Sequence, residues 1–430
     1  MVKKSVGRKW ETSNVMPTFS IKVFFLLTLA LIHFSLRART IRVGSAYPVH
    51  TIKSAIDQSA AGDTILVASG IYHEKNLVIN KSVVLIGKNY PVLEGEGKYE
   101  IVSIKADYVQ FDGFKVQHSG YATLEDPAGI KVYNRKYVTI SNNIIDDSFF
   151  GIYIQNGFKC IVKNNKLTSY GKQEQQIGSG IHCWKCDSMK IVGNTISGHR
   201  DGIYFEFVTN SVIWRNRSTK NIRYGLHFMF SNDDSYISNY FSENGAGVAV
   251  MFTHGVKMIN NYFTESWGDA AYGLLLKEIS DSYIEGNHFS KNTMGVYMEG
   301  ASRVKMLKNV FESNGWAIKI QASCMDVTVT GNNFFGNTFD IATNGSLVLN
   351  NFNSNYWDKY EGYDLNKDRV GDVPYRPISM YSMIIEQNPP AMILYRSIMV
   401  SLLDKSEKLL PSLTPENLKD ETPCMKPLKL

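Results

Sequence analysis

Short runs of alternating apolar and polar residues fill the middle of the chain, and these runs recur about every 22 residues. Segments such as GIYIQNGFKCIVKNN and GVAVMFTHGVKMINN are rich in Val, Ile, Phe and Tyr, which is typical of strands. Two markers keep the same phase. The motif Asn-x-apolar begins at Asn143, Asn165, Asn194, Asn216, Asn239, Asn261, Asn287, Asn309 and Asn332. A Gly precedes each alternating run at Gly129, Gly151, Gly180, Gly202, Gly225, Gly247, Gly273 and Gly295, and Ala317 takes the same place once.

A fixed period of this length predicts a solenoid, because one coil is too small to bury its own apolar side and must stack on its neighbours. We interpret the chain as an all-β protein with a right-handed parallel β-helix. The repeated Asn then lies buried above the Asn of the previous coil and forms hydrogen bonds along the stack.

The repeat divides the chain into segments. Thr51 is placed to cap a short helix that ends before Gly62, and this helix would cover the open edge of the first coil. The segments are a signal peptide (1–38), an N-terminal cap with irregular coils (39–128), the regular β-helix (129–345), a C-terminal capping segment (346–390), and an amphipathic helix with a Pro-rich tail (391–430).

Strand alternation predicts which side chains face outward. The first and third residues after each repeat Gly are mainly apolar and should face the core, so the second and fourth should face out. Met229 and Met251 then stand on adjacent coils about 4.8 Å apart. His227 lies on the same face and His254 lies where the strand turns. Thioether and imidazole ligands suit Cu(I); the alternative is that these methionines pack under a loop or against a partner.

His182, Cys183 and Cys186 form a second soft cluster. Cys183 should face the core, so a buried structural cysteine or a local disulfide competes with metal binding. A single CxxC is a weak zinc or copper signal.

Oxygen donors follow in DLNKDRVGD, at Asp364, Asn366, Asp368 and Asp372. Their spacing resembles a calcium loop. However, Arg369 stands where such loops carry Gly, and Tyr375 where they carry Glu. Asx turns explain the same residues.

Two coils are longer than the rest, with extra residues at 169–179 and 266–271. Extra residues in a solenoid form surface loops, often on the binding face. Candidate acid–base residues for sugar hydrolysis are few, and each also reads as a solvated turn residue. They are Asp146, Asp147, Asp233, Asp234, and the His199-Arg200-Asp201 run. No pair of them predicts an enzyme.

The first 38 residues account for most of the positive net charge of the chain. Basic residues precede the apolar run VFFLLTLALIHF, which is typical of a secretory signal. The chain has 46 Lys and Arg and 40 Asp and Glu. The leader contains six of the basic residues and one of the acidic residues, so the remainder carries 40 basic and 39 acidic residues. Such a balance does not indicate a nucleic-acid partner. The five cysteines are too few for a disulfide scaffold.

Several long segments resemble the NosD family. They are GLHFMFSNDDSYISNYFSENGAGVAVMFTHGVKMINNYF, YGLLLKEIS, NGWAIKIQAS, FDIATNG, NYWDKYEGYDLNKDRVGDVPYRP and PPAMILYRSIMVSLLDKSEKLLP. The resemblance implies a periplasmic β-helix protein that is not an enzyme. It implies a part in assembling the copper–sulfur centre of nitrous oxide reductase, together with an ABC-type ATPase, a membrane permease and a copper chaperone lipoprotein.

On that resemblance, the helix over residues 391–410 becomes a candidate contact with the permease, although it could also pack on the solenoid. Its apolar stripe is Met392, Ile393, Ile398, Met399, Leu402 and Leu403. The competing hypothesis is a secreted β-helix that binds or acts on a polysaccharide, which predicts an acidic, aromatic-lined groove.

Overall fold

The computed structural model describes residues 7, 38–121, 126–268, 271–345, 349–409 and 418–430. Two compact units divide the chain at residues 39 and 40, and the second unit contains the described helices and strands. The expected signal peptide, residues 1–38, lies almost wholly outside the described residues. Among the helices of the described part, none is long and apolar enough to cross a membrane.

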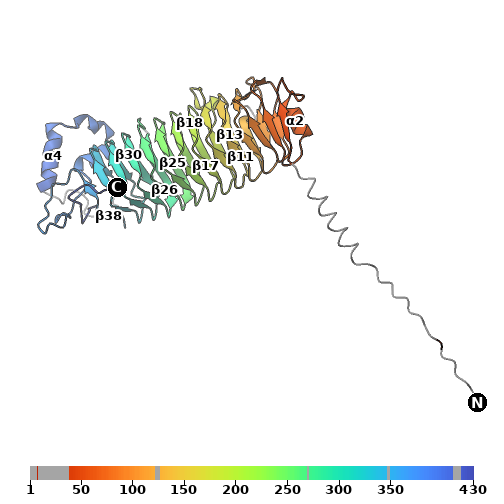
Figure 1. Cartoon of the computed structure of the whole chain (residues 1–430). Helices are drawn as coiled ribbons and strands as arrows, with labels where there is room; N and C mark the ends of the chain where they lie inside the picture. Colours follow the sequence, from red (N-terminus) through yellow and green to blue (C-terminus); the bar gives the residue numbers. More distant parts are fainter. Residues whose placement is uncertain (1–6, 8–37, 122–125, 269–270, 346–348, 410–417) are drawn as a thin grey trace, which may run out of the picture. The chain divides into compact units, whose positions relative to one another are not determined.

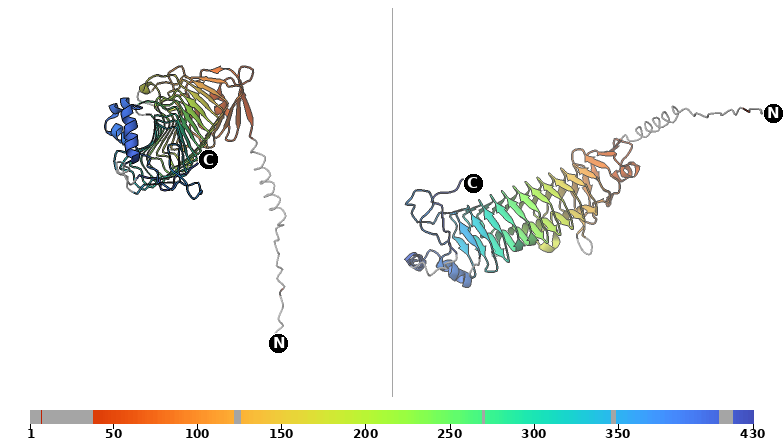
Figure 2. Two further views of the ribbon diagram at one scale, coloured as in Figure 1. Left: turned by 90° about the vertical axis from the view of Figure 1, so that its left-hand side faces the viewer. Right: turned by 90° about the horizontal axis from the view of Figure 1, so that it is seen from below.

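The described residues between Thr40 and Trp357 fold into a parallel β-helix, as the repeat predicts. Every pairing between named strands is parallel, and successive coils add strands in turn to three sheets, here called A, B and C (Figures 1 and 2).

Sheet A contains β1 (Thr40–Val43), β2 (Thr64–Val67), β5 (Val84–Gly87), β8 (Gln110–Asp112), β11 (Thr139–Ser141), β14 (Ile161–Lys163), β17 (Lys190–Val192), β20 (Val212–Trp214), β23 (Ser235–Ile237), β26 (Lys257–Ile259), β29 (Tyr283–Glu285), β32 (Lys305–Leu307), β35 (Thr328–Thr330) and β38 (Asn351–Asn353). Sheet B contains β3 (Ile71–Tyr72), β6 (Val92–Glu94), β9 (Lys115–Gln117), β12 (Ile144–Asp146), β15 (Lys166–Thr168), β18 (Thr195–Ser197), β21 (Arg217–Thr219), β24 (Tyr240–Ser242), β27 (Tyr262–Thr264), β30 (His288–Ser290), β33 (Val310–Glu312), β36 (Asn333–Phe335) and β39 (Tyr356–Trp357). Sheet C contains β4 (Leu77–Ile79), β7 (Val102–Ile104), β10 (Ala128–Tyr133), β13 (Phe150–Gln155), β16 (Ile181–Trp184), β19 (Asp201–Glu206), β22 (Tyr224–Met229), β25 (Ala246–His254), β28 (Tyr272–Ser280), β31 (Met294–Glu299), β34 (Trp316–Ile320) and β37 (Phe339–Ala342). The helical segments are α2 (Ile52–Gln58), η1 (Glu174–Gln176), α3 (Met380–Gln387), η2 (Pro389–Leu394) and α4 (Ile398–Leu409).

The repeat Gly allows neighbouring coils to approach closely. A Cβ atom built on Gly151 would lie 2.5 Å from the carbonyl oxygen of Gly180 and 2.6 Å from a methyl carbon of Leu167. Both distances are shorter than a van der Waals contact, so a larger residue would push the coils apart. The Gly marker in the sequence therefore reports backbone packing.

The predicted Asn ladder is present at the corner between sheets A and B. The side chain of each Asn accepts from the backbone N–H and from the amide group of the Asn one coil before it. For example, Asn239 Oδ1 accepts from Asn216 N at 2.9 Å and from Asn216 Nδ2 at 3.0 Å. These side chains are buried, so the ladder satisfies polar groups that the turn would otherwise leave unpaired.

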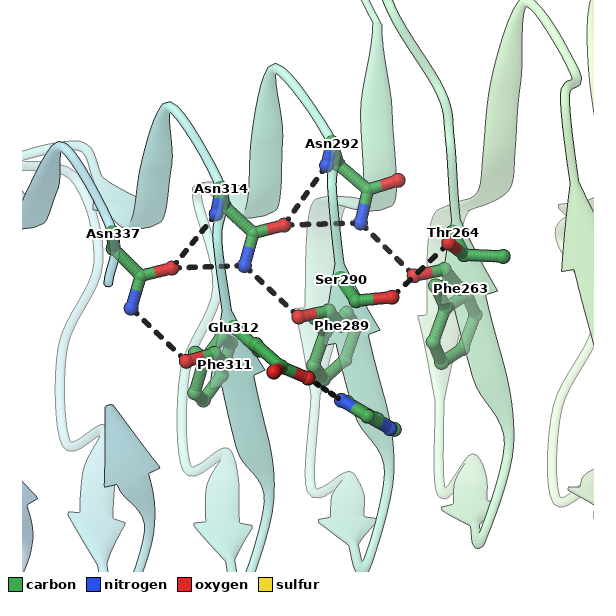
Figure 3. A network of polar contacts seen from close by, with 10 residues as sticks. Phe263, Thr264, Phe289, Ser290, Asn292, Phe311, Glu312, Asn314 and Asn337 are labelled. Atoms are coloured by element: carbon green, nitrogen blue, oxygen red, sulfur yellow. Dashed lines mark hydrogen bonds and ion pairs between the residues drawn. The ribbon is translucent and has the colours of Figure 1, made fainter. Parts of the chain in front are cut away.

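A second polar ladder, which the sequence reading missed, lies at the corner between sheets B and C. Asn314 Oδ1 accepts from the backbone N–H of Asn292, and Asn337 Oδ1 accepts from that of Asn314, each at 3.0 Å (Figure 3). Between the two ladders, Phe263, Phe289 and Phe311 stack in the core with ring centroids 4.7 and 4.9 Å apart.

Both ends of the stack are covered. Thr51 accepts from the backbone N–H of Ser54 and begins α2, as expected, although this helix ends at Gln58. At the other end Asp420 takes the place of the next ladder Asn. Its Oδ2 accepts from the backbone N–H of Asn355 and from Trp357 Nε1. The sequence analysis predicted only a Pro-rich tail there and assigned it no part in the ladder.

The continuous helix predicted over 391–410 is wrong in its extent. The structure instead has η2 and α4, separated by Arg396 at φ +65°, a backbone conformation that ends helices. Helix α3, which the sequence reading did not predict, packs on β37 at the C-terminal end of the coils (Figure 1). The Nζ of Lys319, on β34, lies 2.7 Å from the carboxylate of Glu386 on α3.

Candidate functional site

The candidate copper ligands lie on the outer face of sheet C. Register places Met229 of β22 beside Met251 of β25, as the periodicity predicts. It places His227 between Tyr204 and Ala249 on the neighbouring strands. Met229 and Met251 are half-buried, and the Tyr204 hydroxyl donates to Met229 Sδ at 3.8 Å. A parallel sheet thus brings one imidazole and two thioethers to one surface.

His227 is far more enclosed than an outward position suggests. Its ring stacks on Tyr204 with centroids 4.6 Å apart, and Tyr224 lies at 4.9 Å on its own strand. Only 6% of the residue is exposed, and neither ring nitrogen has a hydrogen-bond partner. Burial, followed by the positive charges of Arg223 and Arg200, lowers the pKa of His227 to about 3. The ring is therefore a neutral base whose two nitrogens are buried and have no hydrogen-bond partner.

A buried carboxylate faces this imidazole. Asp201 is fully buried, and its Oδ2 lies 4.0 Å from His227 Nδ1. Arg200 Nε approaches Asp201 Oδ2 at 3.4 Å, and Arg223 Nε lies 3.9 Å from Oδ1. Burial raises the pKa of Asp201 despite these two guanidinium groups. The sequence analysis considered Asp201 as a candidate acid–base residue or a turn residue, and did not place it beside His227.

His254 lies apart from the other three candidates. The chain turns at Phe252, which has φ +54°, and His254 follows this turn with 58% of its side chain exposed. Its Nε2 lies 4.0 Å from Asp233. The sequence analysis placed His254 where the strand turns, and this turn at Phe252 separates His254 from the other three candidates.

The structure separates the members of the His182 cluster. His182 lies on the outer face, stacked between Tyr153 and Tyr204, whereas Cys183 faces the core as expected. The Cys186 thiol accepts from the backbone N–H of Gly157 at 3.2 Å. All five cysteines are free. Because His182 and Cys183 point to opposite sides of the strand, these three residues do not form one ligand set.

The acidic loop uses its oxygens for turns. Asp364 accepts from the backbone N–H groups of Asp368 and Arg369, and Asp372 accepts from that of Leu365. Within the described residues, no group of three or more His, Cys, Asp or Glu is placed to hold a metal ion. The hydrogen bonds match the Asx-turn alternative; Asn366 likewise accepts from Asp368.

The C-terminal helical segments carry an exposed apolar surface. Exposure reaches 89% for Ile393 and 82% for Ile398. Met399 and Leu402 are also exposed, whereas Met392 and Leu403 are half-buried. Val400 turns inward to pack with Phe339, Tyr381 and Ile385. We call the exposed set of Ile393, Ile398, Met399 and Leu402 the α4 surface.

Both longer coils insert their extra residues at the corner between sheets B and C. One insertion joins β15 to β16, and the other joins β27 to β28. The three sheet C strands between these positions are β19, β22 and β25, which carry Asp201, His227, Met229 and Met251. The first insertion also contacts this region, because Arg223 Nε lies 4.0 Å from Glu174 of η1. The insertions thus bracket the candidate site.

The carboxylates considered for catalysis are bound elsewhere. Asp146 accepts from the Tyr170 hydroxyl and lies 3.3 Å from Lys115 Nζ. Asp234 is buried and accepts from the backbone N–H of Ser211. His199 is buried below the insertion at 169–179.

Comparison with known proteins adds to this geometry. Residues 168–362, which include His227, Met229 and Met251, match the family described as "Periplasmic copper-binding protein (NosD)". Residues 42–234 match a family described as a protein of unknown function. The chain is 26% identical over 384 residues to "Probable ABC transporter binding protein NosD" of Stutzerimonas stutzeri, covering 78% of this chain and 80% of that one. It is 26% identical over 379 residues to the protein of that name in Pseudomonas aeruginosa, covering 84% and 87%.

These matches support a NosD-type protein. Solved structures add evidence on the fold alone. A GH87 α-1,3-glucanase of Streptomyces thermodiastaticus aligns with a TM-score of 0.54 at 13% identity, covering 71% of this chain and 65% of that one. PfbA, a surface adhesin of Streptococcus pneumoniae, aligns at 0.51 and 13% identity, covering 72% and 88%.

Proposed function

We propose that this NosD-type protein is a periplasmic binding protein that delivers copper, with or without sulfur, for assembly of the copper–sulfur centre of nitrous oxide reductase. It acts with an ABC-type ATPase and permease and receives copper from a lipoprotein chaperone. The copper-binding description of the matched family and the ABC-transporter description of the two relatives support this role. The proposed role is binding and transfer without catalysis.

The observation that carries the proposal is the set of His227, Met229 and Met251 on one face of sheet C. Imidazole and thioether are ligands that prefer Cu(I). His227 fits this use because its buried ring nitrogens have no hydrogen-bond partner. Its low pKa means that protons do not compete with the metal near neutral pH. His254 would join only if the turn at Phe252 moved.

The α4 surface is the proposed contact with the permease. Large apolar side chains that project this far into solvent from a folded domain mark interaction sites. The supporting α3 helix is fixed to sheet C by Lys319 and Glu386. The permease contact would then lie on the same side of the β-helix as the copper face, since α3 packs on β37 of sheet C.

The copper proposal is tested by Cu(I) titration of residues 40–430 under anaerobic, reducing conditions against a chelator of known Cu(I) affinity. The variant combines His227→Ala, Met229→Leu and Met251→Leu. The matched control combines His288→Ala on sheet B, Met325→Leu in the loop before β35, and Met425→Leu in the C-terminal tail. We expect tight binding in the native and control proteins and its loss in the variant. Equal binding by variant and control would contradict the site.

The polysaccharide hypothesis is tested in parallel. Turnover or tight binding of a uronic-acid polymer by the native protein would favour it over copper transfer. The outer face of sheet C offers no paired, exposed carboxylates at the candidate positions, because Asp201 is buried and Glu206 lies 3.8 Å from His182.

A further inference from the structure

Two buried polar side chains of sheet C face each other. Asp201 of β19 is fully buried, and only 6% of His227 on β22 is exposed. Asp201 Oδ2 lies 4.0 Å from His227 Nδ1. Among the described residues, neither ring nitrogen of His227 has a hydrogen-bond partner, and Asp201 Oδ1 has none either. Buried polar groups are normally paired, so this arrangement requires a reason.

Strand register defines what lies on each side of the imidazole. Asp201 pairs with Tyr224, which comes three residues before His227 along β22. Met229 follows His227 by two residues on the same face, and Met251 lies beside Met229 on the next coil. The carboxylate is therefore toward the beginning of β22, and the two thioethers are toward its end.

Two aromatic rings hold the imidazole between these sides. The ring of Tyr204 stacks on it with a centroid distance of 4.6 Å and an interplanar angle of 12°, and the ring of Tyr224 lies at 4.9 Å and 47°. A ring enclosed in this way turns over only if its neighbours move. Nδ1 is on the edge that faces Asp201, so Nε2, across the ring carbon Cε1, is on the other side.

Two guanidinium groups hold the carboxylate in place. Arg200 Nε donates to Asp201 Oδ2 at 3.4 Å, and Arg223 Nε lies 3.9 Å from Oδ1. Arg223 Nε is also 4.0 Å from Glu174 of the first insertion. Each carboxylate oxygen accepts more than one hydrogen bond, so Asp201 can accept a further one from an Nδ1–H of His227.

We infer that Asp201 is a positioning residue for copper, which accepts a hydrogen bond from Nδ1–H of His227 and so leaves the lone pair of Nε2 toward Met229 and Met251. A neutral imidazole has one N–H and one lone pair, so the tautomer decides which nitrogen binds a metal. Histidines that bind metals commonly donate their other N–H to a carboxylate, which fixes the tautomer. A movement of about 1 Å shortens the observed 4.0 Å to hydrogen-bond length. The inference rests on the proposed copper function.

The tautomer is measured first, in the copper-free protein at neutral pH. Long-range nitrogen–proton correlation NMR of the histidine side chains distinguishes a protonated ring nitrogen from an unprotonated one, and His227→Gln identifies the His227 signals by their loss. We expect a protonated Nδ1 and an unprotonated Nε2. Asp201→Asn keeps almost the same shape but offers Nδ1 a donor as well as an acceptor, and Asp201→Ala offers neither. Protonation should therefore shift toward Nε2 in both variants.

Copper binding is measured next, by anaerobic Cu(I) titration against a chelator of known affinity. Cu(I) affinity should fall about 10- to 100-fold in both variants, the usual effect of removing the partner that orients a metal-binding histidine. The matched control is Glu312→Gln, which removes the carboxylate that lies 3.0 Å from Nε2 of His288 on sheet B. This control should change neither the tautomer of His227 nor the affinity for Cu(I).

The tautomer and the affinity must change together. An Nε2–H tautomer in the native protein, or an unchanged Nδ1–H tautomer in both variants, would overturn the inference. A lower affinity without a change of tautomer would also overturn it, because the carboxylate would then act through its charge or through the fold. If the tautomer shifts as expected but the native protein binds no Cu(I), the copper function fails, while the contact between Asp201 and His227 stands.

Discussion

Removing one rung of the Asn ladder should destabilise the whole β-helix. Asn239→Ala deletes four side-chain hydrogen bonds. Oδ1 no longer accepts from the N and Nδ2 atoms of Asn216, and Nδ2 no longer donates to the carbonyl oxygen of Ile213 and to Asn261 Oδ1. All of these groups are buried or lie in the strand edge beneath the turn, so water does not replace the lost partners without opening the coil.

The four bonds do not contribute equally. Asn216 Nδ2 keeps the carbonyl oxygens of Ile191 and Trp214, and Asn261 Oδ1 keeps the backbone N–H of Asn239. The backbone N–H of Asn216 loses its ladder acceptor. An orphaned buried donor costs about 1–3 kcal/mol and each of the three further lost hydrogen bonds about 1 kcal/mol, so the free energy of unfolding should fall by about 4–6 kcal/mol.

The assay is equilibrium urea unfolding followed by circular dichroism, with hydrogen exchange at the Asn216 amide as a local readout. The control is Asn351→Ala on β38, because Asn351 is exposed and outside the ladder; its effect should be within about 0.5 kcal/mol. We expect faster exchange at Asn216 in Asn239→Ala alone. If both variants unfold at the same urea concentration, the ladder does not stabilise the fold as argued.

Three further changes test other parts of the structure. Burial raises the pKa of Asp234 to about 8, far above the value of about 4 in an unfolded chain. The stabilisation from the protonated carboxyl group is therefore complete below about pH 4 and should be lost as the pH rises to about 8. Asp234→Asn should remove this pH dependence from unfolding curves measured across that range. Thr51→Ala removes the cap of α2 and should lower the free energy of unfolding by about 1 kcal/mol, measured by urea unfolding, with Thr195→Ala at an exposed position of β18 as a comparison. Lys319→Ala leaves the part-buried Glu386 without its partner. The rate of backbone hydrogen exchange should rise over α3 and α4, while the coils stay protected. An unchanged rate in α3 would contradict the anchoring role of the ion pair.

Periodicity predicted the features that repeat. The Asn ladder, the inward positions of Ile152 and Cys183, and the pairing of Met229 with Met251 all follow from a fixed coil length. Each of these features depends on residues that lie one coil apart, and the period of the repeat gives that spacing directly. Of the six segments that carried the NosD resemblance, the first four lie within the family match at residues 168–362, the fifth begins there, and the last lies beyond it.

Features that depend on local departures from the repeat were not predictable. The burial of His227 depends on its contacts with the rings of Tyr204 and Tyr224, and its low pKa depends also on two arginines. The alternation of apolar and polar residues carries no information about these contacts. The insertion at 169–179 was recognisable as a loop, but its conformation depends on how Ile177 packs against Gly171.

Asp420 has a consequence for how the protein is made. The rung that completes the Asn ladder is 65 residues later in the chain than Asn355, which it contacts. Synthesis proceeds from the N-terminus, so the earlier coils can form while the ribosome is still producing α3, η2 and α4. Throughout that interval the strands of the last coil present unpaired backbone groups, the feature that promotes association between chains. The nascent protein is therefore most prone to aggregate after its solenoid is already built.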